Sequence, residues 1–338
     1  MKRHLLIALL FVTATAFAQN GATVDEAARF LAGLPVTGVL EPLTHDTGWQ
    51  EHAAAMDEAW TKKEKLQIAP IREWMNTNAS QFHLSSDTMF YMFSGPDFLY
   101  ANIFFPNANS YILAGLEPIG QVPDLTRIPP EMLRGELAAL RGSMSTILRF
   151  QYFITKDMRA EFGRGSIGGT LPILYVFLAR LGYTVMDVTR MNSPVDGVKI
   201  TFTEGDRPQT LYYFKTDLAG ANSNFLRWSA ARGPGLSLLK AASFLLHGDG
   251  FSGVRTFLLE HSRVIVQDDS GLPLRAFPKG WKVNLYGRYV PHKEEFQKYY
   301  QPQLAALYTQ EPQPSPLGFA FGYHWQKEDG ILMLATHD

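Results

Sequence analysis

Residues 88–118 read TMFYMFSGPDFLYANIFFPNANSYILAGLEP, and this stretch predicts the centre of the fold. Two short apolar runs, 88–93 and 111–114, have the length and composition of strands buried on both faces. Between them Pro96 suits the start of a helix and Pro106 ends one, so residues 98–104 are expected to form about two helical turns. The stretch therefore predicts a βαβ-like unit.

Polar residues follow each of these two expected strands. Ser94, Gly95 and Asp97 come after the first strand, and Glu117 comes after the second. If the strands are parallel, these residues lie at strand carboxyl ends, where open α/β sheets bind their ligands. Ser94 and Gly95 are therefore candidate ligand-binding residues, and Asp97 and Glu117 are candidate catalytic carboxylates.

The rest of the chain predicts helices before this unit and antiparallel strands after it. Trp49, Ala53, Met56 and Trp60 recur at helical spacing within residues 19–80, and residues 236–246 are expected to form a further helix. Residues 198–203 alternate between apolar and polar side chains and should pair with 211–214 as a hairpin. Residues 319–323 and 331–334 could form a closing hairpin.

Together these patterns predict a mixed α/β or α+β fold. A helical N-terminal segment, 19–80, packs on a mixed sheet that holds the βαβ-like unit and antiparallel C-terminal hairpins. Residues 81–338 are expected to form one domain, because no internal boundary stands out in the sequence.

The first twenty residues predict export. Lys2 and Arg3 precede an apolar run over 5–16 that is too short to span a bilayer, and Ala16-Phe17-Ala18 fits a cleavage site. Residues 1–18 are therefore interpreted as a signal peptide, which implies a periplasmic or secreted protein beginning at Gln19. No later run of about 18 apolar residues is present, so no integral membrane anchor is expected after cleavage.

Composition excludes several classes of protein. Of the 338 residues, 46% are hydrophobic and 19% are charged, which is typical of a globular core. After removal of Lys2 and Arg3, 29 basic residues face 32 acidic ones, so nucleic acid is not an expected partner. The absence of cysteine excludes disulfides and thiolate metal sites.

The familiar cofactor and hydrolase motifs are missing or lack their context. Residues 163–168, GRGSIG, match the letters of a dinucleotide-binding loop, but the preceding residues 156–162 are too polar for the buried strand that such a loop requires. No cofactor is therefore expected. GxSxG is absent, so no serine-hydrolase nucleophile is predicted. HExxH is also absent, so no metal site is predicted. His45 and His52 are interpreted as surface histidines.

Two further groups of residues remain open to a functional or a structural interpretation. Asp268 and Asp269 follow an expected strand and could act as catalytic carboxylates, or they could simply form a turn. Arg275 and Arg288 lie near aromatic residues and could bind an anionic or sugar ligand, or they could belong to an exposed strand face.

Three functions fit these patterns. The first is a periplasmic or secreted binding or accessory protein, with a cleft at the strand ends for a small molecule or an envelope component. The second is an exported hydrolase that uses paired carboxylates among Asp97, Glu117, Asp268 and Asp269. The third is a structural envelope protein that binds another protein through an aromatic surface. Nothing in the sequence shows whether the protein is an enzyme.

Overall fold

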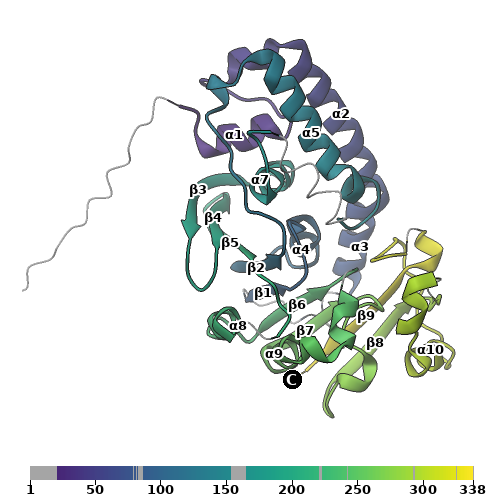
Figure 1. The fold of residues 1–338 in the computed structure, drawn as a ribbon. Helices are drawn as coiled ribbons and strands as arrows, with labels where there is room; N and C mark the ends of the chain where they lie inside the picture. The colour runs from purple at the N-terminus through teal and green to yellow at the C-terminus, as the bar shows by residue number, and fades with distance from the viewer. Residues whose placement is uncertain are drawn as a thin grey trace, which may run out of the picture.

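The computed structural model describes residues 21–78, 80, 82, 87–153, 165–220, 223–241, 243–291, 294–324 and 326–337. The predicted signal peptide and the first two residues of the GRGSIG motif lie outside the described residues. The described residues form a nine-stranded mixed sheet with helices on both faces (Figure 1). The predicted mixed α/β class, with an N-terminal helical segment packed on the sheet, is therefore confirmed.

Five parallel strands form the middle of the sheet. The strand order is β3-β4-β5-β2-β1-β6-β7-β9-β8, in which β5, β2, β1, β6 and β7 are parallel and the two outer pairs are antiparallel. The strand bounds are β1 (Thr88–Tyr91), β2 (Ser110–Gly115), β3 (Thr184–Met191), β4 (Gly197–Glu204), β5 (Arg207–Lys215), β6 (Gly235–Leu239), β7 (Ser262–Gln267), β8 (Lys282–Gly287) and β9 (Ile331–Thr336).

Helices cover the two faces unequally. Figure 1 shows α1, α2, α5 and α7 on one side of the sheet and α8 and α9 on the other. The α-helices are α1 (Val24–Leu31), α2 (Thr47–Lys63), α3 (Ala69–Thr77), α4 (Phe98–Phe104), α5 (Pro130–Arg149), α7 (Thr170–Arg180), α8 (Ser223–Ala230), α9 (Ser252–His261) and α10 (Pro302–Tyr308). The short helices are η1 (Glu41–His45), η2 (Glu64–Ile68), which is a π turn, η4 (Leu125–Arg127), η5 (Ser243–His247), η6 (Asp249–Phe251), η7 (Leu274–Ala276), η8 (Glu294–Tyr299) and η9 (Lys327–Asp329).

The predicted βαβ-like unit is confirmed. β1 and β2 are parallel neighbours, and α4 connects them over the bounds expected from the sequence. Met89 and Tyr91 face the core beneath the N-terminal helices, whereas Phe90 and Met92 face the core beneath α8 and α9. Because both faces are covered, the strand is a continuous apolar run without alternation.

Two predicted elements are wrong in detail. Residues 235–239 form strand β6, not the start of a helix, because this five-residue run is buried on both faces and carries no polar side to mark its period. Residues 319–323 form no strand; β9 instead pairs with β7 and β8. β9 lies between these two strands in the sheet, so both of its edges are already paired. The antiparallel strands predicted for the C-terminal part are present.

No helix in the described part of the chain is both long enough and apolar enough to cross a bilayer.

His52 is a buried residue and not the surface histidine predicted from sequence, whereas His45 is exposed. His52 Nε2 lies 2.8 Å from the Leu31 carbonyl oxygen, and Nδ1 lies 3.0 Å from Nη1 of Arg141. Because the guanidinium can only donate, Nδ1 accepts and Nε2 carries the proton. Burial lowers the pKa of His52 to about 4, so the ring is neutral at pH 7.

His52 should make the protein lose stability on acidification. Between pH 6.5 and 4 the unfolded chain binds a proton at this residue and the folded chain does not, so stability falls as the pH is lowered. The expected loss across this window is about 3 kcal/mol. Urea unfolding of the wild type and of His52→Gln at several pH values measures it. Equal pH slopes for the two proteins would contradict this assignment, and His45→Gln is the exposed control.

Candidate functional site

The connections that follow the central strands diverge at β1 and β6, at the carboxyl ends of these strands. β1 lies between β2 and β6, both parallel to it. After β1 the chain enters α4 on one face of the sheet, and after β6 it leads to α9 on the other face. Because the two connections diverge to opposite faces, ligands in open α/β sheets bind between them. The residues that follow β1 and β6 therefore lie where a ligand is expected to bind.

A buried ion pair joins these two connections. Lys240 directly follows β6, and its Nζ lies 2.8 Å from Oδ2 of Asp97, with both side chains almost fully buried. The Tyr91 hydroxyl donates to the same oxygen over 3.0 Å. Oδ1 of Asp97 accepts the backbone N–H of Tyr100 over 3.2 Å and caps α4. Both oxygens of Asp97 therefore have partners, and the carboxylate holds β1, α4 and β6 together.

A second buried lysine lies beside the first. Lys240 Nζ donates to the carbonyl of Gln151, and Lys63 Nζ donates to the carbonyl of Phe150. Both ammonium groups lie over the ring of Tyr100, at 3.8 Å from the centroid for Lys240 and 5.3 Å for Lys63. These carbonyls follow the C-terminal end of α5, where cations interact favourably with the helix dipole. Lys240 thus attaches the end of α5 to the sheet, and Lys63 attaches it to α2.

The cluster shifts the titration of its own groups. Burial, helped by the neighbouring Lys240 and opposed by Asp97, lowers the pKa of Lys63 to about 7. Burial also lowers the pKa of Lys240, and the Asp97 carboxylate opposes that change. Burial raises the pKa of Tyr91, and the adjacent Asp97 charge raises it further, so this hydroxyl keeps its proton and remains a donor.

Glu117 occupies the other half of the predicted site. Its side chain is buried, and the Tyr213 hydroxyl donates to its carbonyl over 2.9 Å and to Oε2 over 3.3 Å. A Cβ added to Gly115 would lie 2.4 Å from that Oε2. Gly95, which has a φ of +54°, lies on the same carboxylate, with Oε2 3.4 Å from where its Cβ would be. The two glycines therefore leave the space that Glu117 fills.

Two adjoining cavities open at these residues. The smaller one has a volume of about 40 Å³ and is lined by Tyr91, Phe93, Ser94, Gly95, Asp97, Glu117, Tyr152, Phe153, Lys240 and Ala241. The larger one has a volume of about 290 Å³ and is lined by Phe93, Gly95, Gly115, Leu116, Glu117, Thr216, Asp217, Leu218, Ala219, Leu245 and Phe251. Phe93, Gly95 and Glu117 line both, so the acidic side chain lies where the cavities meet. These cavities are called the inner and outer cavities below.

The structure brings together four of the candidate residues, because Ser94, Gly95, Asp97 and Glu117 all line the inner cavity. Ser94 also joins the two strand ends: its N–H donates to the Ala114 carbonyl over 2.9 Å. Its hydroxyl donates to the carbonyl of Gly95 over 2.8 Å. The site predicted from the end of β1 and the end of β2 is therefore one place in space.

Asp268 and Asp269 have structural partners beside this site. Oδ2 of Asp268 accepts the N–H of Ala241 over 2.9 Å, and Oδ1 accepts both the N–H and the hydroxyl of Ser270. Ala241 has a φ of +53°, a strained conformation for a residue with a Cβ, and these bonds hold it there.

Burial and the neighbouring Asp269 raise the pKa of Asp268 to about 6. Asp269 Oδ1 lies 3.4 Å from Nε2 of His324. Neither aspartate lines the inner or the outer cavity.

The two candidate arginines lie in different cavities from this site. Arg275 lines a cavity of about 400 Å³ that adjoins the outer cavity at Leu245 and Phe251. Arg288 lines a separate groove of about 850 Å³ together with Tyr289, Tyr300 and Tyr308. Within the described ranges, no three histidine or acidic side chains come together as the ligands of a metal ion would.

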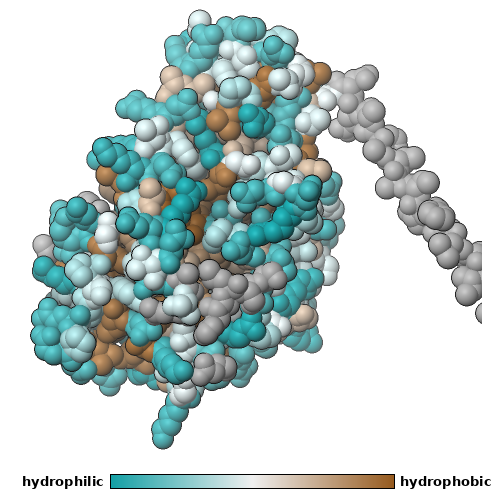
Figure 2. Space-filling view, turned by 180° about the vertical axis from the view of Figure 1, so that it is seen from behind, coloured by the Kyte–Doolittle hydropathy of each residue, from teal (hydrophilic) through white to brown (hydrophobic). Residues whose placement is uncertain are grey.

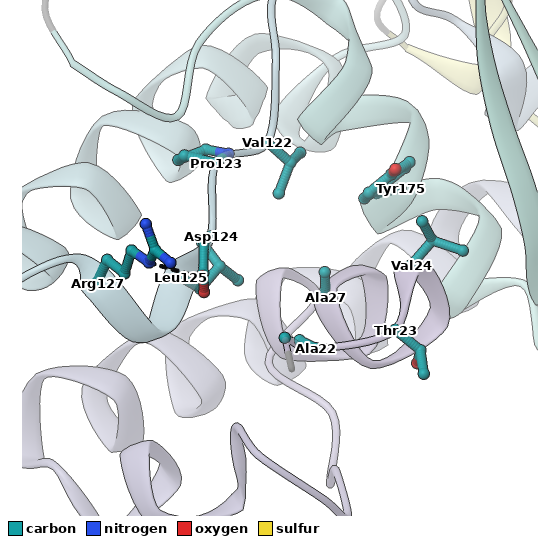
Figure 3. Close-up of a pocket in the computed structure, with 11 residues that line it drawn as sticks. Ala22, Thr23, Val24, Ala27, Val122, Pro123, Asp124, Leu125, Arg127 and Tyr175 are labelled. Carbon is teal, nitrogen blue, oxygen red and sulfur yellow. Dashed lines mark ion pairs between the residues drawn. The ribbon is translucent and has the colours of Figure 1, made fainter. Parts of the chain in front are cut away.

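A further cavity lies between α1 and the 122–127 segment (Figure 3) and shares no lining residue with the inner or the outer cavity. It has a volume of about 520 Å³, and Tyr175 of α7 projects toward it. Its charged pair, Asp124 and Arg127, is 3.1 Å apart and solvent-exposed. Exposed pairs of this kind are weak, so this cavity offers no buried charge for recognition.

Lys63 and Lys240 are the residues of the site that sequence patterns did not reveal. The sequence predicts a helix over 236–246, in which a lone lysine would face solvent, so Lys240 does not stand out as a site residue. A signal is nevertheless present: Gly233-Pro234-Gly235 precedes the short run Leu236-Ser237-Leu238-Leu239, which Lys240 closes, and this is the pattern of a buried strand followed by a polar residue. Lys63 belongs to a group of lysines at a helix end, and nothing local distinguishes it from its exposed neighbour Lys62.

Comparison with protein-family models, with curated proteins and with solved structures finds no match for this chain. Its function must therefore be inferred from the chemistry of the residues around the two cavities.

Proposed function

We propose that this chain is a periplasmic or secreted binding protein, and that its ligand is a small molecule with an apolar body and a protonated amine. The observation that carries the proposal is the position of Glu117. This buried carboxylate lines both the inner and the outer cavity, at the carboxyl ends of the central strands. A ligand in the outer cavity could therefore reach it with one polar end.

The outer cavity suits an apolar body. Five of its eleven described lining residues have large apolar side chains, namely Phe93, Leu116, Leu218, Leu245 and Phe251. Leu116 and Leu245 are each 45% exposed, which is unusual for side chains of this size. Exposed apolar side chains gathered around a concave surface are typical of ligand sites, because binding removes them from water.

The charges around the outer cavity favour a cationic head group. Among the described residues that line it, Glu117 and Asp217 are acidic and none is a lysine or an arginine. An ammonium group would form charge-assisted hydrogen bonds to Glu117, whereas a carboxylate ligand would meet charge of its own sign. The cavity should therefore discriminate between ligands of the same shape by their charge.

Calorimetric titration of the protein with hexylamine, hexanol and hexanoate tests this proposal. Hexylamine should bind most tightly, because a charge-assisted hydrogen bond contributes about 1.5–3 kcal/mol, roughly 10- to 100-fold in affinity. Glu117→Gln keeps the shape of the side chain and should abolish the preference for the amine over the alcohol.

The control for this experiment is Glu58→Gln, which removes an exposed carboxylate on α2 and should leave the preference intact. Unfolding curves of both variants establish that they are folded. Equal affinity of the wild type for hexylamine and hexanol, or an undiminished preference in Glu117→Gln, would overturn the proposal.

A second candidate, an exported hydrolase, is favoured by one observation. Asp97 and Glu117, two buried carboxylates, line the same inner cavity. In such a reaction Glu117 would be the proton donor, since Asp97 is already paired with Lys240. Chromogenic glycosides provide the test: hydrolysis that disappears in Glu117→Gln supports an enzyme, and inertness toward the whole panel counts against it.

The third possibility, a protein that binds partners through an aromatic surface, gains no support from the face shown in Figure 2. Hydrophilic side chains cover most of that face, and hydrophobic ones show in separate hollows between them. A surface that binds protein partners is more commonly a continuous apolar patch of several hundred Å².

The export part of the proposal rests on the sequence of residues 1–18 and has its own test. Expression of the full chain with its N-terminus intact should yield a mature protein that begins at Gln19. Mass spectrometry of the periplasmic or culture fraction measures this directly. An intact chain that starts at Met1 and stays with the cytoplasm would contradict the predicted export.

A further inference from the structure

The cavity that contains Arg275 has the opposite charge to the outer cavity. Among its described lining residues, Arg275 and Lys298 are cationic and none is acidic. Both side chains are exposed, so they are hydrated and available to an anionic group. Burial lowers the pKa of His247, which also lines this cavity, so this ring contributes no charge at neutral pH. This cavity is called the basic cavity below.

The wall of the basic cavity is aromatic. Phe244 and Tyr299 stack with their ring centroids 4.5 Å apart and their planes at 9°. Lys298 Nζ lies 5.0 Å from the centroid of the Tyr299 ring. Stacked rings of this kind provide a rigid apolar surface beside the cations.

The basic and outer cavities are neighbours. Leu245 and Phe251 line both, so the acidic cavity and the basic cavity adjoin at these two side chains. Leu245 is 45% exposed and Tyr300, on the wall of the basic cavity, is 44% exposed. With Leu116 at the other end, exposed apolar side chains extend along both cavities. The two adjoining cavities therefore bring together a buried carboxylate, exposed apolar side chains and a pair of cations.

We propose that the ligand of this protein is a short apolar peptide with free termini. Its ammonium group binds Glu117, its side chains pack against Leu116, Leu245 and Phe251, and its carboxylate binds Arg275 and Lys298. This inference rests on the proposed function, because it places the amine of the ligand at the same carboxylate. It adds a binding site for the carboxylate at the other end of the ligand.

The chemistry of the two ends supports a peptide over a simple amine. A guanidinium presents a planar pair of N–H donors that matches a carboxylate, and a nearby ammonium adds a second charge. A peptide carries opposite charges at its two ends, and each added residue lengthens it by at most about 3.3–3.6 Å. A series from two to five residues therefore locates the length that spans both cavities.

Calorimetric titration of the protein with Leu/Phe peptides of two to five residues tests the inference. Each peptide is compared with its C-terminal amide and with its N-acetyl form. At the optimal length, amidation and acetylation should each weaken binding at least tenfold. In Arg275→Gln the free acid and the amide should bind alike, and acetylation should still weaken binding. In Glu117→Gln the peptide with a free amine and its N-acetyl form should bind alike, and amidation should still weaken binding.

The outcomes separate this inference from the proposed function. If hexylamine binds but the acid and amide peptides bind alike, or no peptide binds, the inference fails and the proposed function stands. If hexylamine does not bind in preference to hexanol, the proposed function itself fails. Lys279→Gln is the control, because it removes an exposed cation from the same loop, outside the lining of the basic cavity. It should behave as the wild type.

Discussion

Replacing Asp97 with Asn is expected to lower the free energy of unfolding by about 3–5 kcal/mol. The substitution keeps the side-chain oxygen that accepts the N–H of Tyr100, so α4 retains its cap. It removes the negative charge that lies 2.8 Å from Lys240 and leaves a buried ammonium without its counter-charge. Urea unfolding at pH 7 measures the loss.

A double variant separates the ion pair from other effects of the substitution. In Asp97→Asn/Lys240→Met both charges of the ion pair are gone, and exchanging a buried ion pair for uncharged residues is often close to neutral. Most of the stability lost in Asp97→Asn should therefore return. Asp196→Asn is the matched control: its pair with Arg190 is exposed, with 3.7 Å between the charged atoms, so the expected loss is below about 1 kcal/mol. A double variant as unstable as Asp97→Asn would show that the charge on Lys240 is not the cause.

Lys63 should make the protein more stable as the pH rises from 7 to 10. Its pKa is lowered to about 7 in the folded protein, from 10.5 in an unfolded chain. Between these values the unfolded chain binds a proton that the folded protein does not, so each pH unit should add about 1.4 kcal/mol. Substitution by Met removes the titrating group and should flatten the curve by that slope.

Unfolding of the wild type, Lys63→Met and Lys62→Met at pH 7, 8, 9 and 10 measures this difference. Lys62 lies next to Lys63 but is exposed, so its variant should keep the slope of the wild type. Equal slopes for Lys63→Met and the wild type would mean that Lys63 is protonated in the folded protein up to its ordinary pKa. The way in which the folded protein stabilises a second buried ammonium group, beside that of Lys240, would then require another explanation.

The centre of the fold could be predicted because its signals are local. The run 88–93, the prolines that delimit α4 and the run 111–114 lie within one short segment, and each element follows from its own residues. The placement of Asp97 and Glu117 at one site followed from a single rule about parallel strands. The glycines beside Glu117 belong to the same segment.

The rest of the site could not be predicted because its partners come from distant parts of the chain. Lys240 follows β6 and Asp97 precedes α4, and the strand order brings these two together. Lys63 belongs to α2 and reaches them through the packing of that helix. Residues 235–239 carry no period that distinguishes a buried strand from a buried helix, so Lys240 was assigned to the wrong element. His52 was misplaced for a related reason, since its burial depends on Leu31 and Arg141, which belong to two other helical regions.

The most direct test of the binding site is an NMR titration with hexylamine, in protein whose leucine methyl groups are labelled. Leu116, Leu218 and Leu245 line the outer cavity, whereas Leu317 lines the separate groove beside Arg288. We expect the signals of the first three leucines to shift together with one dissociation constant and the signals of Leu317 to stay unchanged. Shifts confined to Leu317, or no shift at the three leucines of the outer cavity, would contradict it.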